Sequence, residues 1–356
     1  SRGLGDVYKR QMNGSVLLLH RSDYGCCNTL LAEQVGMLGR YTEAFFPELV
    51  YVRPQGQIEK RDSLEGSAFI DFPVDQTMIY PDYRRNTAEL GKIQSSIDSV
   101  RNDTDITITS VWLKGYASPE GSYAHNKELA IGRTAALKRY IQQLYRFEGD
   151  VITTDYEPED WAGLRYYVER SNLAHRAEIV TLIDGNLEPD AKEWKIKRDY
   201  PMEYSFLLQN CYPALRHTDY RIAYTIRSYS DVEEIKRIMC ERPQKLDLNE
   251  FYLAAQEYEP GTDEFTEVFE TAVRMFPDDT IANLNAANAA MRRGDLTSAK
   301  RYLAKADDSP EAVYARGALA IRQKDYDSAR RYLNEAKSLG LEQAGITLEQ
   351  LEKGRR

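Results

Sequence analysis

Residues Trp112 to Tyr145 read WLKGYASPEGSYAHNKELAIGRTAALKRYIQQLY, and the architecture of the chain follows most directly from them. They begin as the apolar end of a strand, pass through a turn rich in Gly and Pro, and continue as a long amphipathic helix. Asn126 and Arg133 therefore stand close to the point where a strand ends and a helix begins. This arrangement is typical of a binding site, and the stretch holds no nucleophile or metal-ligand pattern.

Strand and helix patterns alternate on both sides of this stretch. Leu90, Ile93, Ile97 and Val100 form the apolar stripe of an amphipathic helix, and isoleucine alternates with threonine from Ile106. Strands are expected at 67–72, 106–113, 151–156 and 220–226, and helices at 90–100 and 129–144. Because strands separated by helices of this length need crossover connections, the pattern predicts an α/β domain whose mixed sheet carries helices on one face.

Two further regions are helical in pattern. Residues 158–215 interrupt the alternation and are interpreted as an insertion before the last strand. Beyond it, Ser230 is the expected N-cap of a helix that ends near position 240. From position 246 onward helix pairs repeat, with AKRYLAKA at Ala299–Ala306 and ARRYLNEA at Ala329–Ala336 placed 30 residues apart. Such a unit buries its apolar face only by stacking on the next, so the tail is expected to be a short all-α solenoid.

The N-terminal part of the chain is less regular. Residues 1–11 read as non-native sequence, and residues 12–60 as the remnant of a truncated β-rich domain with a strand at Leu49–Val52. The polar residues 55–65 are interpreted as a linker. The remaining boundaries follow from the patterns above: the α/β domain at 66–229, a linker helix at 230–245 and the helical repeats at 246–352.

Composition excludes some classes of protein. Apolar residues make up 42% of the chain and charged residues 29%, which describes a globular protein without a bilayer-spanning run. The net charge of −9 and the dispersed arginines disfavour a nucleic-acid partner. The four cysteines, Cys26, Cys27, Cys211 and Cys240, form no CxxC pair that would suit a zinc site. The adjacent Cys26 and Cys27 could form separate disulfides or none, and buried or free thiols are the better explanation.

The sequence carries no enzyme signature. None of its four histidines falls in a metal spacing or in a nucleophile motif. The acidic run Glu157, Glu159 and Asp160 could be read as paired carboxylates for glycoside hydrolysis. Acids at a helix N-terminus also favour the helix dipole, which is the better explanation. We therefore expect no catalysis, no metal and no cofactor.

The central stretch resembles the OmpA-like C-terminal domain, a module that holds peptidoglycan in many Gram-negative envelope proteins. The resemblance covers about 67–229 and rests on a Gly-containing turn followed by an N-x-x-L-x-x-x-R-x-A helix, here Gly115 to Gly121 and then Asn126 to Ala135. In that family a turn Asp binds the ammonium group of the diaminopimelate in the stem peptide, and the helix Arg binds its carboxylate. Ser118 and Arg133 stand at these two positions with the family spacing of 15 residues.

The resemblance implies a ligand site, and simpler interpretations exist for each residue in it. Ser118 has no charge for an ammonium, so Glu120 is a hypothetical replacement, and Ser118 could instead be the helix N-cap. Asn126 could hold the turn through backbone hydrogen bonds. Arg133 could be a solvated helix arginine. Arg221 matches family arginines of the last strand, or could serve only as a solubilising charge on an edge strand.

The tail resembles tetratricopeptide (TPR) repeats. Small and apolar residues recur at the family positions, including Gly317, Ala320, Ala329, Leu333 and Ala336, although the unit has 30 residues instead of the usual 34. Such arrays bind peptides or proteins on their concave side. We expect Asn283, Asn288 and Arg316 to line this groove; the alternative is an inert helical spacer.

Together the two resemblances imply a non-catalytic cell-envelope protein, located in the periplasm or at the outer membrane. Its OmpA-like module would associate with the peptidoglycan stem peptide or a cell-wall-derived ligand, and its TPR-like tail with a protein partner. The alternative is a protein of the same fold that has lost peptidoglycan binding. In that interpretation the chain is a scaffold for envelope or surface-structure assembly that acts only through protein–protein contacts.

Overall fold

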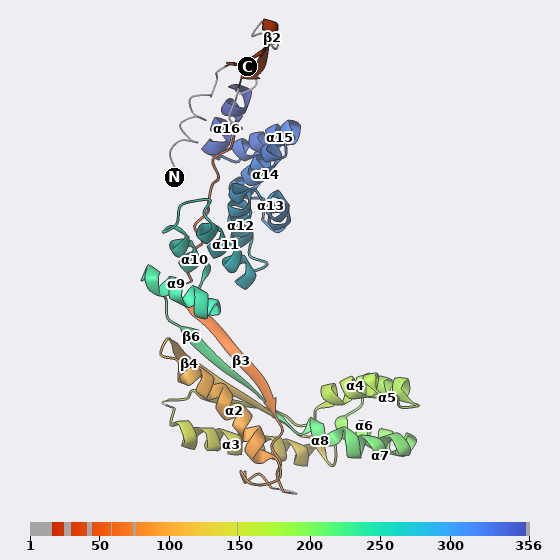
Figure 1. Ribbon diagram of the computed structural model, residues 1–356. Coiled ribbons are helices and arrows are strands. Elements are labelled where there is room, and N and C mark those ends of the chain that lie inside the picture. Colours follow the sequence, from red (N-terminus) through yellow and green to blue (C-terminus); the bar gives the residue numbers. More distant parts are fainter. Residues whose placement is uncertain are drawn as a thin grey trace. The chain divides into compact units, whose positions relative to one another are not determined.

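The computed structural model describes residues 16–24, 30–40, 45–57, 59–73, 76–147 and 149–353. They form a mixed α/β protein (Figure 1) whose contacts gather into two compact units. The first, the sheet unit, spans Gln57–Tyr229. The second, the helix unit, joins Ser230–Arg356 with the N-terminal Ser1–Gly56. No helix in the described ranges is long and apolar enough to cross a membrane.

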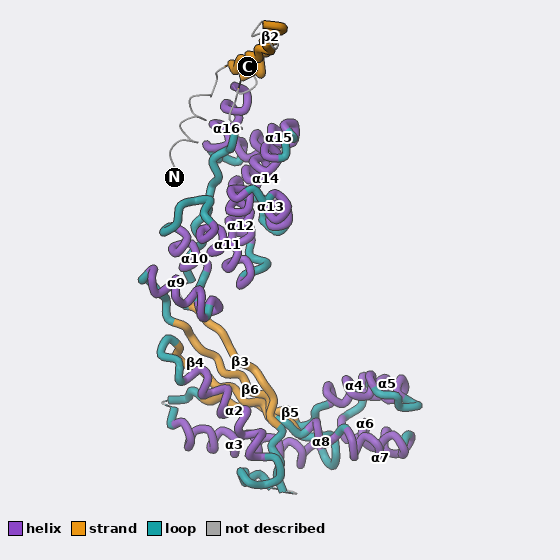
Figure 2. Tube along the Cα trace, in the orientation of Figure 1, coloured by secondary structure: helices purple, strands orange, loops and turns teal. Residues whose placement is uncertain are grey.

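The sheet unit is built on four strands in the order β3-β6-β4-β5 (Figure 2). β4 (Ile106–Tyr116) is parallel to β5 (Ile152–Glu157) and antiparallel to β6 (Thr218–Ile226). β6 is also antiparallel to β3 (Lys60–Ala68). The mixed sheet is therefore as expected, and β6 occupies a central position in it.

Two helices cover one face of this sheet. α2 (Asn86–Arg101) packs on β3, β4 and β6, and α3 (Tyr123–Tyr145) packs on β4 and β5 (Figure 1). Their apolar stripes share one core with alternate residues of the strands, including Val111 and Ile222. Along β6 the even-numbered residues are buried and Arg221 on the opposite face is exposed, which is the period of two that a half-buried strand requires.

The first strand differs from the prediction. Residues 55–65 are not simply a linker, since β3 begins at Lys60, and the strand ends at Ala68 instead of continuing through 72. β3 pairs with β6 at the edge of the sheet. Its charged residues Arg61, Asp62 and Glu65 face solvent and hide the strand pattern, although Lys60 at its start is buried. An edge tolerates these charges because one face and one side of the strand remain open to water.

The insertion between β5 and β6 is helical, as expected, and has a core of its own that includes Leu164 and Leu207. Asp160 caps its first helix by accepting a hydrogen bond from the Gly163 amide at 2.8 Å. The helices are α4 (Trp161–Arg170), α5 (Arg176–Asp184), α6 (Pro189–Asp199), α7 (Pro201–Asn210) and α8 (Tyr212–Leu215).

The helix unit begins with α9 (Val232–Glu241), whose N-cap is Asp231 and not Ser230. The Asp231 carboxylate accepts hydrogen bonds from the amides of Glu233 and Glu234. A short 3₁₀ helix at Pro243–Lys245 leads to the remaining helices. These are α10 (Leu248–Ala255), α11 (Asp263–Met275), α12 (Thr280–Arg293), α13 (Leu296–Leu303), α14 (Pro310–Arg322), α15 (Tyr326–Ser338) and α16 (Glu342–Lys353).

The repeat seen in the sequence has a structural counterpart in the helix caps. Asp295 caps α13 through the Ser298 amide, and Asp325 caps α15 through the Ser328 amide. The two caps stand 30 residues apart, as do the Asp279 and Ser309 caps of α12 and α14. Corresponding helices therefore start at the same place in each 30-residue unit.

The N-terminal segment 45–57 belongs to no sheet. The strand expected at Leu49–Val52 is instead an extended chain that packs on the C-terminal helices within the helix unit. Before it, β1 (Val16–Tyr24) and β2 (Leu30–Arg40) form an antiparallel pair. Residues 1–11 and the adjacent cysteines Cys26 and Cys27 lie outside the described residues.

Candidate functional site

The turn between β4 and α3 is held tightly against the end of the sheet. A Cβ atom on Gly115 would lie 1.9 Å from the Thr134 hydroxyl oxygen on α3, so only glycine allows this approach of helix and strand. After the strand, the amide of Ala117 donates to the carbonyl of Glu157, and the Ala117 carbonyl accepts from the Asp160 amide at 3.0 Å. The turn is thus fixed beside the C-terminal ends of β4 and β5.

Ser118 and Glu120 in this turn both contact Arg216, which lies just before β6. Arg216 Nε donates a 2.9 Å hydrogen bond to the hydroxyl of Ser118, which is 4% exposed. The same guanidinium forms an ion pair with the Glu120 carboxylate. Ser118 is not the helix cap that the sequence suggested, because that role belongs to Ser122, whose hydroxyl accepts from the His125 amide.

Asn126 lies beneath the turn and is buried. Its side-chain amide donates a 2.8 Å hydrogen bond to Glu159 Oε1, and Trp161 Nε1 donates to Glu159 Oε2 at 2.8 Å. Burial raises the pKa of Glu159, and these two hydrogen bonds partly oppose the rise. Asn126 therefore joins α3 to the start of the insertion through a carboxylate side chain, where the sequence had suggested backbone contacts.

Arg133 is half-buried on α3. Its guanidinium carbon lies 5.0 Å from the centre of the Phe72 ring, and its Nε donates a long 3.4 Å hydrogen bond to the Gln76 carbonyl. Arg133 and Arg216 line one small hollow together with Tyr116 and His217. The cavity volume is about 10 Å³, which is room for roughly one water molecule.

His217 closes one side of this hollow. Its ring stacks on Tyr116 with centroids 4.4 Å apart, and its Nε2 lies 3.5 Å from Asp219 Oδ1. Burial lowers the pKa of His217, but the hydrogen bond and charge of Asp219 and the charge of Asp160 outweigh it, so the pKa lies above its ordinary value. The groups lining the hollow are thus mainly cationic or aromatic, which suits an anion better than an ammonium group.

Arg221 does not take part in this hollow. It projects from the opposite face of β6, where its Nε contacts Glu65 Oε1 and its guanidinium lies 5.7 Å from the centre of the Trp112 ring. β6 is a central strand and not the edge strand that the sequence suggested. The structure therefore brings together Ser118, Glu120 and Arg133 around Arg216 and places Arg221 elsewhere.

A second site is the surface of α11, α12 and α14 on which the extended segment 45–56 packs, and we call this surface the groove. We call this segment the strap. Asn285 on α12 contacts the strap backbone twice, accepting from the Val52 amide at 2.9 Å and donating to the Val52 carbonyl at 2.7 Å. Asn288 donates to the carbonyl of Val50 at 2.7 Å, and the Tyr314 hydroxyl donates to that of Glu48 at 2.6 Å.

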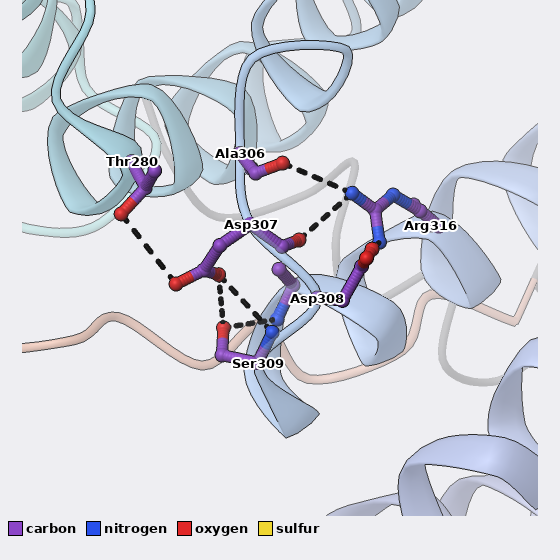
Figure 3. A network of polar contacts seen from close by, with 7 residues as sticks. Thr280, Ala306, Asp307, Asp308, Ser309 and Arg316 are labelled. Atoms are coloured by element: carbon purple, nitrogen blue, oxygen red, sulfur yellow. Dashed lines mark hydrogen bonds and ion pairs between the residues drawn. The ribbon is translucent and has the colours of Figure 1, made fainter.

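The two other residues predicted for this groove have internal roles. Asn283 donates to the carbonyls of Pro277 and Asp279 and so fixes the start of α12. Arg316 donates to the carbonyls of Ala306 and Asp307 and forms an ion pair with Asp308 (Figure 3). Asp307 in turn accepts from Ser309, so Figure 3 shows a network that fixes the loop before α14. Asn288 alone of the three touches the strap.

The sequence did not point to Arg216, Asn285 or Tyr314. Arg216 lies in a loop 98 residues from Ser118, where no periodic pattern identifies it. Asn285 stands two residues after Asn283 in the buried part of α12, Ala282–Met291. A polar residue among buried positions needs a partner, and this need is the only signal that the sequence offers for it. Tyr314 is likewise fully buried, with a hydroxyl that needs a partner.

The described residues contain no group of three or more His, Cys, Asp or Glu that could hold a metal ion. Within them Cys211 is buried and Cys240 is exposed, and both are free thiols. Burial raises the pKa of the Cys211 thiol to about 12, which makes it unreactive near neutral pH. No protein-family model matches the chain, and no curated protein matches it.

Proposed function

We propose that the protein is a non-catalytic scaffold of the cell envelope whose OmpA-like module does not bind the peptidoglycan stem peptide. The observation that carries this is the contact of Arg216 with Ser118 and Glu120. Within the resembling family this turn supplies a negative charge for an ammonium group. Here the turn carboxylate is already paired with a cation from the same chain.

The energetics favour the same conclusion. A ligand ammonium would have to displace Arg216 from Glu120 and leave the buried Ser118 hydroxyl without its donor. Losing a hydrogen bond to a charged group costs about 1.5–3 kcal/mol, and an unpaired buried polar group costs a similar amount. The hollow beside Arg133 is also too small for a side chain as long as that of diaminopimelate unless the lining residues move.

Sedimentation with purified sacculi tests the proposal. We expect the protein to remain in the supernatant, and Arg216→Ala, which frees Glu120, to increase the pelleted fraction. Arg221→Ala on the opposite face of β6 is the matched control and should change nothing. Pelleting of the parent protein that Arg133→Ala abolishes would contradict the proposal.

A second candidate function is peptidoglycan association through carboxylates, because two arginines line the same hollow. A guanidinium binds a carboxylate with two parallel hydrogen bonds, so Arg133 and Arg216 would suit an anionic cell-wall fragment. In that case the parent protein pellets with sacculi, and Arg133→Ala and Arg216→Ala each reduce pelleting while Arg221→Ala does not. The opposite responses to Arg216→Ala separate the two candidates.

The TPR-like helix unit would supply the protein–protein contacts of such a scaffold. Its 30-residue register of helix caps and its peptide-holding groove support this role. A periplasmic or outer-membrane location follows from the OmpA-like resemblance. The absence of catalysis is part of the proposal, and release of soluble muropeptides from sacculi would contradict it.

A further inference from the structure

The groove of the helix unit binds the backbone of the strap at regular intervals. The contacts fall on Glu48, Val50 and Val52, so every second residue is bound by a side chain from α12 or α14. An extended chain turns alternate carbonyls to the same side, which gives this period. Recognition of this kind fixes the direction and register of a bound peptide.

Three side chains of the strap pack on separate parts of the groove. Tyr51 stacks on Phe269 with ring centroids 5.4 Å apart and meets the edge of Phe265 at 5.1 Å. Leu49 is buried in the core formed by α12, α13 and α14. Phe46 lies between two cations, 5.3 Å from the Arg292 guanidinium and 4.7 Å from that of Arg322.

The strap and the groove are thus a peptide ligand and its receptor within one chain. They are far apart in sequence: Val52 and Asn285 are separated by 233 residues, and the whole sheet unit lies between them. Every copy of the chain carries both halves of the interface. Exchange of an identical element between copies costs little, because the same contacts form within a chain and between chains.

The closed arrangement also leaves some hydrogen-bonding capacity unused. Within the described part of the chain, the Tyr51 hydroxyl and Asn288 Oδ1 are buried and have no hydrogen-bond partner. Each unsatisfied buried group costs about 1–3 kcal/mol, so the strap is held less firmly than its buried area suggests. Partial release of the strap from the groove therefore costs less free energy than release of a segment whose buried polar groups are all hydrogen-bonded.

We propose that the groove binds the strap of a second copy, so that two chains pair by exchanging residues 45–56. The inference rests on the proposed scaffold function and specifies its protein partner. Asn285, Asn288 and Tyr314 bind the incoming backbone, and Phe265 with Phe269 receives Tyr51. Because it involves only the helix unit, its failure would leave the sacculus result unchanged.

Two complementary full-length variants test the exchange. In the strap variant, Tyr51→Ala removes the aromatic anchor, and Val52→Pro removes the backbone amide that donates a hydrogen bond to Asn285 Oδ1. The groove is then open. In the groove variant, Asn285→Leu with Asn288→Leu removes the asparagine contacts to the strap backbone at similar volume and leaves only the Tyr314 contact to the Glu48 carbonyl, so the strap is released more easily. Circular dichroism and thermal melting verify that both remain folded.

The readout is the molar mass measured by light scattering after size exclusion. Each variant alone should be monomeric, and an equimolar mixture should give a species of about twice the mass, because one free strap meets one open groove. Glu48→Gln is the matched strap control and should behave as the parent does. It keeps the Glu48 carbonyl that Tyr314 contacts, and a glutamine oxygen can still accept the long 3.4 Å hydrogen bond from Gln343. Two folded variants that stay monomeric when mixed would overturn the proposal.

A synthetic peptide of residues 45–56 gives an independent measurement. The peptide should bind the strap variant. It should bind the parent at least tenfold more weakly, because the parent's own strap competes for the groove. In excess it should dissociate the mixed dimer. Peptide binding without a mixed dimer would also overturn the proposal, since the groove would then receive a separate partner. Absence of peptide binding to the folded strap variant would overturn it as well.

Discussion

Arg216 is the single residue on which the chemistry of the turn most depends, because it satisfies a buried hydroxyl and an acidic side chain together. We predict that Arg216→Ala destabilises the protein by about 1 kcal/mol. Most of this loss comes from Ser118, since the ion pair with Glu120 is half exposed and contributes little. Urea unfolding monitored by tyrosine and tryptophan fluorescence measures the change. A double variant with Ser118→Ala should recover part of it, and an unchanged midpoint in Arg216→Ala would contradict the assignment.

The pair of His217 and Asp219 gives the sheet unit a dependence on pH. The pKa of His217 is raised on folding, so its contribution is fully present below the unfolded value of about 6.5 and is lost as pH rises through the folded pKa. Burial raises the pKa of Asp219, but hydrogen bonds from His217 and Ser67 lower it by more, so the folded pKa lies below the unfolded value. The contribution of Asp219 to stability is therefore lost as pH falls through the folded pKa.

Stability from this pair should therefore be greatest between those two limits. Unfolding midpoints measured from pH 2 to pH 9 test this, with the His217 ring followed by NMR. We expect Asp219→Asn to lower the pKa of His217 and to flatten the alkaline limb. A His217 titration that is the same in both proteins would show that Asp219 does not control it.

These residues also show how far sequence can identify a site. Arg133 can be named as a candidate from sequence because it stands on a regular helix at a fixed distance from a turn. The ion pair that occupies Glu120 was not found, because Arg216 lies in an irregular loop whose position depends on the fold of the helical insertion. A prediction from sequence could name the groups at the turn but not their partners.

Among the elements, α3 packs closely on β4 at Gly115. A Cβ on Gly115 would lie 1.9 Å from the Thr134 hydroxyl, so we predict that Gly115→Ala destabilises the protein by about 1–3 kcal/mol. Gly91 on α2 is the matched control, because nothing lies within 4 Å of its missing Cβ. Gly91→Ala should stabilise the protein by about 0.5–1 kcal/mol through helix propensity. Thermal melting compares the two, and equal effects would contradict the close packing.

Hydrophobic period predicted most elements of the sheet unit, since α2, α3, β4 and β6 each present one apolar face to a common core. It failed for β3, where Arg61, Asp62 and Glu65 lie on an edge strand that needs little burial. It also failed at Leu49–Val52. A short apolar run such as Leu49–Val52 is expected both for a strand in a sheet and for an extended strap in a groove, so only the elements it packs against distinguish the two.

At the scale of the whole molecule, the division into two units predicts where a core mutation acts. Leu113 lies in the core of the sheet unit and Leu333 in that of the C-terminal helices, both fully buried. Replacing either residue by Ala should lower the free energy of unfolding by about 2–5 kcal/mol. Hydrogen exchange followed by mass spectrometry should show faster exchange within 57–229 for Leu113→Ala and within 230–353 for Leu333→Ala. Uniform acceleration in both variants would contradict two separate cores.

The order of synthesis gives the strap a further consequence. Its apolar residues Leu49 to Val52 leave the ribosome well before Asn285 is made, because Asn285 follows Val52 by 233 residues. At ordinary rates of translation this delay is roughly 10 to 50 s. Throughout that time a short segment of high β-propensity is exposed without its receptor, which is the state that chaperones bind. The nascent chain should therefore depend on holding factors until α12 and α14 emerge, even though both units are compact once complete.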